Sequence, residues 1–259
     1  MREEPLRGIA VLVTRAREQA APLITAVRAA GGEPLLLPAL EIVPVTPAQA
    51  GTTAPDLVIF VSPNAVRHGA HYLTLPACRM AAIGPATAEA MRRAGRAPDV
   101  APQGGYDSES LLQEPTMADM DGKRVLIIRG RGGRELLAET LRGRGAGVEY
   151  AEVYERRRPA PRRDEIEAVL DALSDGRLRY VTCLSVATLH NLSALLGEHA
   201  AAVLRGTTLV SASARVLQLA VSEDLAGGTL LAQGPEPSDL VRAMIFPPGT
   251  PGQSGSDHD

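Results

Sequence analysis

Short apolar runs alternate with amphipathic stretches along most of the chain. Residues 9–14, IAVLVT, are typical of a buried strand, and the charged, periodic stretch 18–30 that follows them predicts a helix. Gly31 and Gly32 are placed to end that helix in a left-handed conformation, and a second apolar run starts at Pro34. A strand, a helix and a strand in this order predict a βαβ unit with parallel strands.

The βαβ pattern occurs twice. Residues 8–31 align without a gap with residues 122–145. The identical pairs are Gly8/Gly122, Val11/Val125, Leu12/Leu126, Arg15/Arg129, Arg17/Arg131, Leu23/Leu137, Arg28/Arg142 and Gly31/Gly145. Weaker similarity relates residues 56–66 to residues 179–189, so the same types of element recur in the same order.

These patterns predict an α/β protein with two similar lobes, each a parallel sheet flanked by helices, and 259 residues give room for both. The proline-rich stretches 44–55 and 156–161 are candidate connections between the lobes. The residues alone leave open whether the lobes are consecutive or interlaced. Residues 248–259 are rich in Gly, Pro and Ser, and we expect this tail to be disordered.

The composition excludes several classes of function. The net charge is −3, and aromatic residues make up only 3% of the chain, which leaves almost nothing for the base-stacking platforms of single-stranded nucleic-acid proteins. Without a general basic field we expect no nucleic-acid partner. The longest uncharged stretch, 180–197, contains polar residues throughout and fits a core strand followed by a helix better than a membrane span. We therefore expect no membrane association.

Cys78 and Cys183 are the only cysteines of the chain. With no signal peptide at the start of the sequence, they predict buried, reduced thiols in a cytoplasmic protein. The five histidines lack metal-ligand spacing, so we expect no metal site. No heptad pattern or long apolar edge suggests self-association, and we expect a monomer.

Four loops follow predicted strands, and ligands of open parallel sheets bind where strands end and helices begin. The loops are residues 14–15, 61–64, 83–87 and 129–134. Ser62 before Pro63 also fits an ordinary N-cap and helix start, and Thr87 is similarly ambiguous. Together the loops form the candidate ligand-binding edge of the protein.

Residues 129–134, RGRGGR, favour an anion, because glycines let a ligand approach the backbone and three arginines supply positive charge. The spacing lacks the third glycine of a dinucleotide fingerprint and is no P-loop. A solvated helix start is the structural alternative. Tyr154 is one of the few proton donors placed to face a cleft, with packing in a strand as its alternative.

Several segments together resemble the uroporphyrinogen-III synthase family. The segments are VLVTR, LLLPALEI, VIFVSPNAV, AAIGPATAEAM, RGRGGRELLAETL and AEVY. The resemblance covers residues 8–245 and is most specific in the first 155 residues. In the later half Ser185 is followed by Val186, where the family has Ser-Pro, while residues 210–215 resemble a bacterial form of its second Gly-Pro-Thr loop.

For the fold, the resemblance implies interlaced lobes joined by a two-stranded linker. The first lobe would combine residues 1–39 with residues 159–247, and the second would be residues 45–154. Residues 40–44 and 155–158 would then be the linkers.

For the function, the resemblance implies an enzyme, a hydro-lyase of haem biosynthesis. It would take hydroxymethylbilane, handed over by the preceding deaminase, expel the hydroxyl as water, invert ring D through a spiro intermediate and close the macrocycle. No cofactor is implied. A linear tetrapyrrole with many carboxylates suits a wide cleft lined by amides, hydroxyls and arginines. Catalysis would consist chiefly of holding the chain folded for attack at the substituted carbon of ring D.

The family's motifs also imply site residues. Those expected to contact the substrate through hydroxyls or backbone amides are Ser62, Asn64, Thr87, Ser185 and Ser213. From charge and position we add Arg15, Arg129 and Gly130, with Arg129 expected to bind a substrate carboxylate. The stretch that matches the family's tyrosine for hydroxyl loss reads Asp171-Ala172-Leu173 here, so this departure leaves Tyr154 as the substitute and the candidate catalytic residue.

Two functions of other classes are compatible with the same pattern. A non-catalytic tetrapyrrole-binding or regulatory protein could keep the two-lobed fold, because fold does not fix function. A nucleotide-dependent transferase could use a doubly wound sheet, although the loops do not predict nucleotide binding. Formation of product separates the first alternative from the enzyme, and nucleotide-induced thermal shifts would reveal the second.

Overall fold

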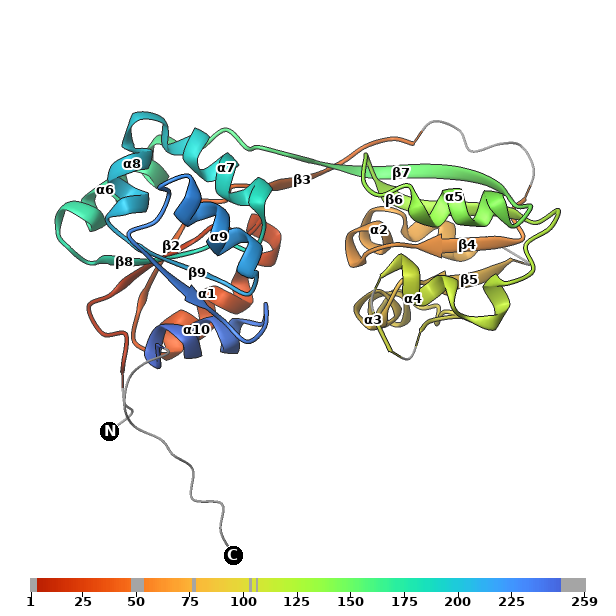
Figure 1. Cartoon of the computed structure of the whole chain (residues 1–259), viewed down its shortest axis with the longest axis horizontal. Coiled ribbons are helices and arrows are strands. Elements are labelled where there is room, and N and C mark those ends of the chain that lie inside the picture. The colour runs from red at the N-terminus through yellow and green to blue at the C-terminus, as the bar shows by residue number, and fades with distance from the viewer. Residues whose placement is uncertain (1–3, 48–53, 76–77, 103, 106, 248–259) are drawn as a thin grey trace, which may run out of the picture. The chain divides into compact units, whose positions relative to one another are not determined.

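The computed structural model describes residues 4–47, 54–75, 78–102, 104–105 and 107–247. The chain divides into two compact units, the first comprising Met1–Glu41 with Arg157–Asp259 and the second comprising Ile42–Arg156 (Figure 1). It leaves the first unit at strand β3 (Glu41–Pro44) and returns at the end of strand β7 (Gly147–Arg157), and these two strands are neighbours in one sheet. The expected disordered tail lies outside the described residues.

The first unit contains a five-stranded sheet in the order β10-β9-β8-β1-β2, and its paired strands are parallel. The strands are β1 (Ala10–Val13), β2 (Glu33–Leu36), β8 (Leu178–Thr182), β9 (Thr208–Ser211) and β10 (Gly228–Leu231). Helices cover both faces. One face carries α6 (Arg163–Ser174), α7 (Val186–Leu196), α8 (Ala200–Arg205) and α9 (Ala214–Ser222), and the other carries α1 (Ala21–Ala29) and α10 (Pro237–Ile245).

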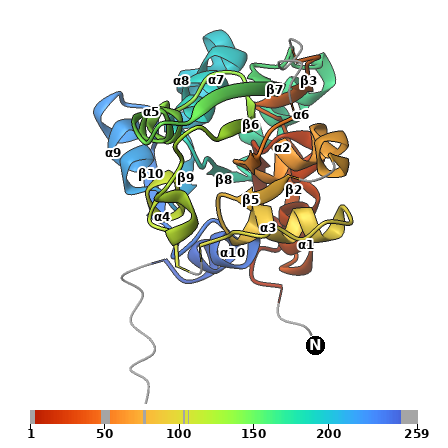
Figure 2. The ribbon, with the colours of Figure 1, turned by 90° about the vertical axis from the view of Figure 1, so that its right-hand side faces the viewer.

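The second unit has the sheet order β3-β7-β6-β4-β5. Its further strands are β4 (Leu57–Phe60), β5 (Arg79–Ala82) and β6 (Arg124–Gly130). Helices α2 (Pro63–His68) and α3 (Pro85–Arg93) pack on one face, and α4 (Ser108–Leu112) and α5 (Leu136–Gly143) pack on the other (Figures 1 and 2). Short 3-10 turns complete the described chain at Arg17–Gln19, Ala70–Thr74, Pro115–Met117 and Gly197–His199.

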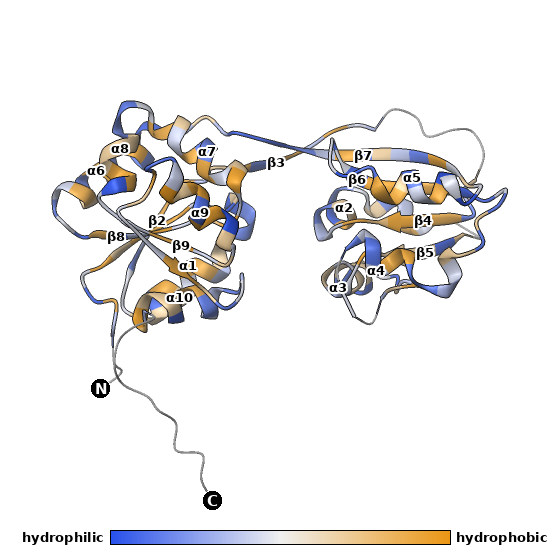
Figure 3. Ribbon diagram, viewed as in Figure 1, coloured by the Kyte–Doolittle hydropathy of each residue, from blue (hydrophilic) through white to orange (hydrophobic). Residues whose placement is uncertain are grey.

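Strand β4 shows why these sequences form covered sheets. All four of its side chains are buried, with Val58 and Phe60 facing α2 and α3 and Leu57 and Ile59 facing α4 and α5. A strand buried on both faces is a continuous apolar run, which is the pattern seen in the sequence. Colouring by hydropathy shows apolar strands inside each unit and polar outer helix faces (Figure 3).

The sequence repeat corresponds to a repeat in topology. The strand order β9-β8-β1-β2 of the first unit reappears as β5-β4-β6-β7 in the second. Val100, which pairs with Ala81 of β5, takes the place of β10. The direction of strand addition therefore reverses at equivalent points, between β8 and β1 and between β4 and β6, and such switch points are where open α/β sheets bind ligands.

The α/β class and the two parallel-sheet lobes are confirmed, with one shift at the first helix. Residues 18–30 were expected to form it, but a 3-10 turn precedes α1, which starts at Ala21 with Pro22 in its first turn. Proline favours that position because it lacks the N–H that a helix start leaves unpaired. Cys78 and Cys183 are both buried and free, as predicted. None of the described helices is long and apolar enough to cross a membrane.

Candidate functional site

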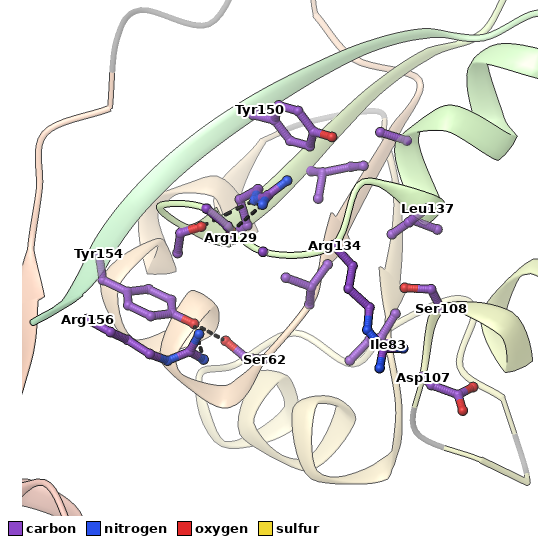
Figure 4. A pocket seen from close by; sticks show the side chains of 16 residues that line it. Ser62, Ile83, Asp107, Ser108, Arg129, Arg134, Leu137, Tyr150, Tyr154 and Arg156 are labelled. Atoms are coloured by element: carbon purple, nitrogen blue, oxygen red, sulfur yellow. Dashed lines mark hydrogen bonds between the residues drawn. The ribbon is translucent and has the colours of Figure 1, made fainter. Parts of the chain in front are cut away.

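A cavity of about 380 Å³ lies in the second unit at the switch point between β4 and β6 (Figure 4). Its lining comes from the ends of β4, β5, β6 and β7, from the glycine-rich loop after β6, and from the starts of α4 and α5. The lining residues are Val61, Ser62, Ile83, Asp107, Ser108, Ile127, Arg129, Gly130, Gly132, Gly133, Arg134, Leu137, Ala138, Tyr150, Tyr154 and Arg156.

A buried tyrosine hydroxyl stands at one side of this cavity. Tyr154 is 1% exposed, and its hydroxyl oxygen lies 3.1 Å from Ser62 Oγ and accepts a hydrogen bond from Arg156 Nη2 at 3.2 Å. Either oxygen can be the donor in the contact between Ser62 and Tyr154. Ser62 also caps α2, since its Oγ accepts from the Ala65 N–H at 2.9 Å. Because a guanidinium can only donate, Arg156 leaves the phenolic proton of Tyr154 available for donation.

An irregular register brings Gly130 opposite Tyr154. Along β6 and β7, Arg129 pairs with Glu152, but the next residue, Gly130, pairs with Tyr154, so one residue of β7 is skipped. Such bulges re-aim side chains beside active sites. A β-carbon at position 130 would lie 2.5 Å from Tyr154 Cε2, so only glycine fits here without movement of the ring.

Arg129 is in β6 and not in the loop that the sequence suggested, and it is 5% exposed. Its Nε donates to Gly130 O at 3.2 Å, its Nη1 contacts Glu135 Oε1 at 3.0 Å, and its Nη2 donates to Gly132 O. The guanidinium carbon lies 4.5 Å from the centre of the Tyr150 ring. The guanidinium expected to bind substrate therefore contacts its own loop in this structure.

Glu135 and Tyr150 complete this cluster. The Tyr150 hydroxyl donates to Glu135 Oε2, and that bond, together with the one from Arg129, holds the pKa of Glu135 below its ordinary value. Burial raises the pKa of Tyr150, and the hydrogen bond to Glu135 raises it further. At neutral pH the cluster is an ion pair of Arg129 and Glu135, and the carboxylate also accepts a hydrogen bond from the neutral phenol of Tyr150.

The loop between Arg129 and α5 is shaped by glycines. Gly132 and Gly133 have φ values of 72° and 115°, which favour glycine. The Gly132 N–H donates to Glu152 Oε1 at 3.3 Å, so this amide holds a carboxylate of the chain itself. Arg134, with its side chain 78% exposed, extends towards Ile83 and Ser108 in Figure 4.

Three predicted residues lie in the first unit at its equivalent edge. Arg15 follows β1, Ser185 caps α7 after β8 by accepting from the Thr188 N–H at 3.1 Å, and Ser213 precedes α9. Arg15 Nη2 donates to Pro235 O, while its buried Nε has no hydrogen-bond partner among the described residues. Burial lowers the pKa of Arg15, and the Glu236 carboxylate opposes that effect.

The structure thus brings together Ser62, Arg129, Gly130 and Tyr154 of the predicted set. Two others belong to the same unit without lining the cavity, Asn64 in α2 and Thr87, which is 2% exposed in the first turn of α3.

Arg134 lies in the loop that the sequence predicted, but three residues of this region were missed: Glu135, Tyr150 and Arg156. Strand periodicity gave no reliable signal, because the bulge in β7 breaks its alternation: Tyr150 packs with the α4/α5 face and Tyr154 with the α2/α3 face. Within the described parts of the chain, no group of three or more His, Cys, Asp or Glu side chains is placed to hold a metal ion.

Comparison with known families identifies this arrangement. Residues 21–241 match the family model described as uroporphyrinogen-III synthase HemD. The chain belongs to the uroporphyrinogen-III synthase family. The resemblance seen in the sequence motifs is thereby confirmed over residues 21–241.

Individual relatives agree with the family match. Uroporphyrinogen-III synthase of Salmonella typhimurium is 36% identical over 162 residues, 57% of this chain and 65% of that protein, just under two thirds of its length. The protein of the same name from Synechococcus elongatus is 31% identical over 77% of this chain and 79% of its own. The solved uroporphyrinogen-III synthetase of Helicobacter pylori shares the fold, with a TM-score of 0.62 at 15% identity over 92% of this chain and 98% of that one.

Proposed function

We propose that the protein is a uroporphyrinogen-III synthase, which cyclises hydroxymethylbilane to uroporphyrinogen III with loss of water and inversion of ring D. The family match over residues 21–241 supports this reaction above all else. The cavity at the β4/β6 switch point adds a buried tyrosine hydroxyl beside arginines and a glycine-rich loop. The overall change is loss of water without oxidation or reduction, so the proposed reaction requires no redox cofactor.

Tyr154 is the proposed proton donor for the first step. Its hydroxyl would protonate the departing hydroxyl oxygen of the substrate while the carbon–oxygen bond breaks, giving water and a stabilised azafulvene cation. The resulting phenolate would accept hydrogen bonds from Arg156 Nη2, now 3.2 Å from the oxygen, and from Ser62. Ring closure later releases a proton, which returns to the phenolate and restores Tyr154.

Positioning is the second contribution. Attack at the substituted carbon of ring D requires the flexible tetrapyrrole to be held folded, and removing that freedom can supply much of a barrier reduction. We propose that Ser62, Asn64, Thr87, Ser185 and Ser213 serve this purpose through their hydroxyls and backbone amides, since all stand at helix starts.

Arg15 is the proposed carboxylate contact of the first unit. Its Nε is a buried donor with no hydrogen-bond partner among the described residues, and a substrate carboxylate would satisfy it. The same carboxylate would oppose the lowering of the Arg15 pKa by burial, because a nearby anion raises an arginine pKa.

The setting proposed for the enzyme follows from the same reading. It acts in the cytoplasm as a monomer and receives its unstable substrate from the preceding deaminase of tetrapyrrole synthesis. Light scattering of the purified protein tests whether it is a monomer. The transfer is tested by measuring how much newly released substrate the enzyme converts before it closes spontaneously in solution.

The direct test of the activity is a coupled assay. A deaminase releases hydroxymethylbilane in the presence of the purified protein, and the oxidised porphyrin isomers are separated chromatographically. Isomer III is expected, because spontaneous closure without ring inversion gives isomer I. Isomer I alone from a folded protein would refute the proposed synthase, and binding of the tetrapyrrole without isomer III would instead support a non-catalytic binding protein.

A further inference from the structure

We infer that Arg129 is a positioning residue, which fixes the loop of residues 130–133 against Tyr154 and does not bind substrate. This inference rests on the proposed synthase activity for its kinetic consequences. Its structural basis is the set of contacts that the guanidinium makes within its own loop.

One guanidinium joins three points of the loop. It contacts Gly130 O where β6 ends, Gly132 O in the middle and Glu135 where α5 begins. The three directions match the planar fork of arginine and exceed what a lysine ammonium can reach from one position. The loop fits closely around this group, since a β-carbon at Gly133 would lie 3.1 Å from Arg129 Nη2.

The positive charge of Arg129 is also already paired with a carboxylate of the protein. Glu135 contacts it at 3.0 Å and is itself held by the Tyr150 hydroxyl, while the Tyr150 ring lies against the guanidinium at 4.5 Å. To bind Arg129, a substrate carboxylate would have to displace the Glu135 carboxylate, which the chain itself holds only six residues away. An intramolecular partner of this kind has the advantage of high effective concentration.

The loop in turn positions the proposed proton donor. The Arg131 N–H donates to Tyr154 O at 2.7 Å, and Gly130 lies against the Tyr154 ring. If the contacts of Arg129 are lost, the segment that carries both interactions loosens. A shift of the proton donor lowers turnover, whereas loss of a direct carboxylate contact weakens substrate binding.

The direction in which KM changes in Glu135→Gln separates these two roles. If Arg129 bound substrate, Glu135→Gln would free its charge and lower KM. The positioning role gives the opposite result: Arg129→Gln and Glu135→Gln each lower kcat for isomer III about tenfold, with KM changed less than about twofold. The double variant is no worse than Arg129→Gln alone, because both changes break one cluster. Arg129→Lys is expected to have a kcat as low as that of Arg129→Gln, because a lysine cannot make the three contacts of the guanidinium.

Arg142→Gln is the matched control. The Arg142 guanidinium lies 5.7 Å from the same Tyr150 ring, but it donates to Val148 O of β7 and does not line the cavity. We expect wild-type kcat and KM from this variant. Melting curves for all variants establish that the folded fraction is the same in each assay.

Amide hydrogen exchange tests the inference independently of activity. Exchange at Arg131 and Gly132, whose N–H groups bond to Tyr154 O and Glu152, is expected to accelerate in Arg129→Gln and Glu135→Gln and to stay unchanged in Arg142→Gln. Unchanged exchange, or a lower KM in Glu135→Gln, would overturn the positioning role. Wild-type protein that makes only isomer I would refute the synthase activity. The positioning role of Arg129 would then be decided by the exchange experiment alone.

Discussion

Gly130 and the Tyr154 ring occupy adjoining space so closely that a β-carbon on Gly130 would lie 2.5 Å from Tyr154 Cε2 and 3.0 Å from its hydroxyl oxygen. The skipped residue in β7 creates this approach by pairing the two positions directly. The Tyr154 ring can therefore occupy its observed position only because residue 130 is a glycine.

Gly130→Ala is expected to displace the Tyr154 ring, lower kcat for isomer III at least about tenfold and cost about 1–3 kcal/mol of stability. Steady-state kinetics and thermal unfolding measure the two effects. Gly122→Ala is the control, because Gly122 has a φ of 66° but no atom within 4 Å of its missing β-carbon. It should lose stability through backbone strain and keep its kcat, and equal kcat values for the two variants would contradict the account.

Tyr154→Phe removes the proposed proton donor and keeps the ring. We expect kcat to fall by no more than roughly a hundredfold, the lower end of acid–base effects, because the substrate ionises readily. The fold should be retained, and Tyr72→Phe, at a tyrosine elsewhere in the same unit, should leave kcat unchanged. Complete loss of activity in folded Tyr154→Phe would show that this modest role is wrong.

Arg156 should act through Tyr154. Arg156→Gln removes the donor 3.2 Å from the phenolic oxygen and is expected to lower kcat less than Tyr154→Phe does. In a Tyr154→Phe background the same change should have no further effect, since the oxygen it serves is gone. Additive losses in the double variant would assign Arg156 a role of its own.

Arg134 is the arginine of the glycine-rich loop that we expect to bind a substrate carboxylate. Its side chain is 78% exposed and lines the cavity. Arg134→Ala should raise KM more than it lowers kcat. The KM of this variant should depend less on salt concentration than the KM of the wild type does. Arg93→Ala, at a 79% exposed side chain outside the cavity, is the control. An unchanged KM in Arg134→Ala would exclude the contact.

Burial raises the pKa of Cys183 to about 12, so the thiol remains protonated in the folded protein. We expect no reaction with thiol reagents at pH 8 until denaturant exposes it, because the thiolate is the reactive form. The unfolded chain releases this proton near its ordinary pKa of 9.0, so the free energy of unfolding should fall as pH rises from there towards 12. Rapid labelling of Cys183 in native protein would contradict its burial.

The periodic patterns predicted the parts of the fold that depend on local sequence. Apolar runs gave the strands, and the Ser62–Pro63 pair correctly predicted the start of α2. The repeat between residues 8–31 and 122–145 anticipated the shared strand order. These features are local because a strand buried on both faces or a helix cap leaves its signal in adjacent residues.

The roles within the site depend on partners distant in sequence or on register, which periodicity does not specify. Arg129 was expected to face a ligand, but its neighbours Tyr150 and Glu135 enclose it, and no spacing rule pairs these three residues. The bulge that sets Gly130 against Tyr154 is a register shift, invisible until β6 and β7 are paired. Strand pairing, and not composition, therefore decides which side chains of β6 and β7 meet at the cavity.

The most direct test of the account is the isomer ratio of the porphyrin formed from freshly released hydroxymethylbilane. With wild-type protein we predict predominantly isomer III, while heat-denatured protein should give isomer I. If folded protein and denatured protein yield the same ratio, dominated by isomer I, the protein does not invert ring D and the proposed function is wrong.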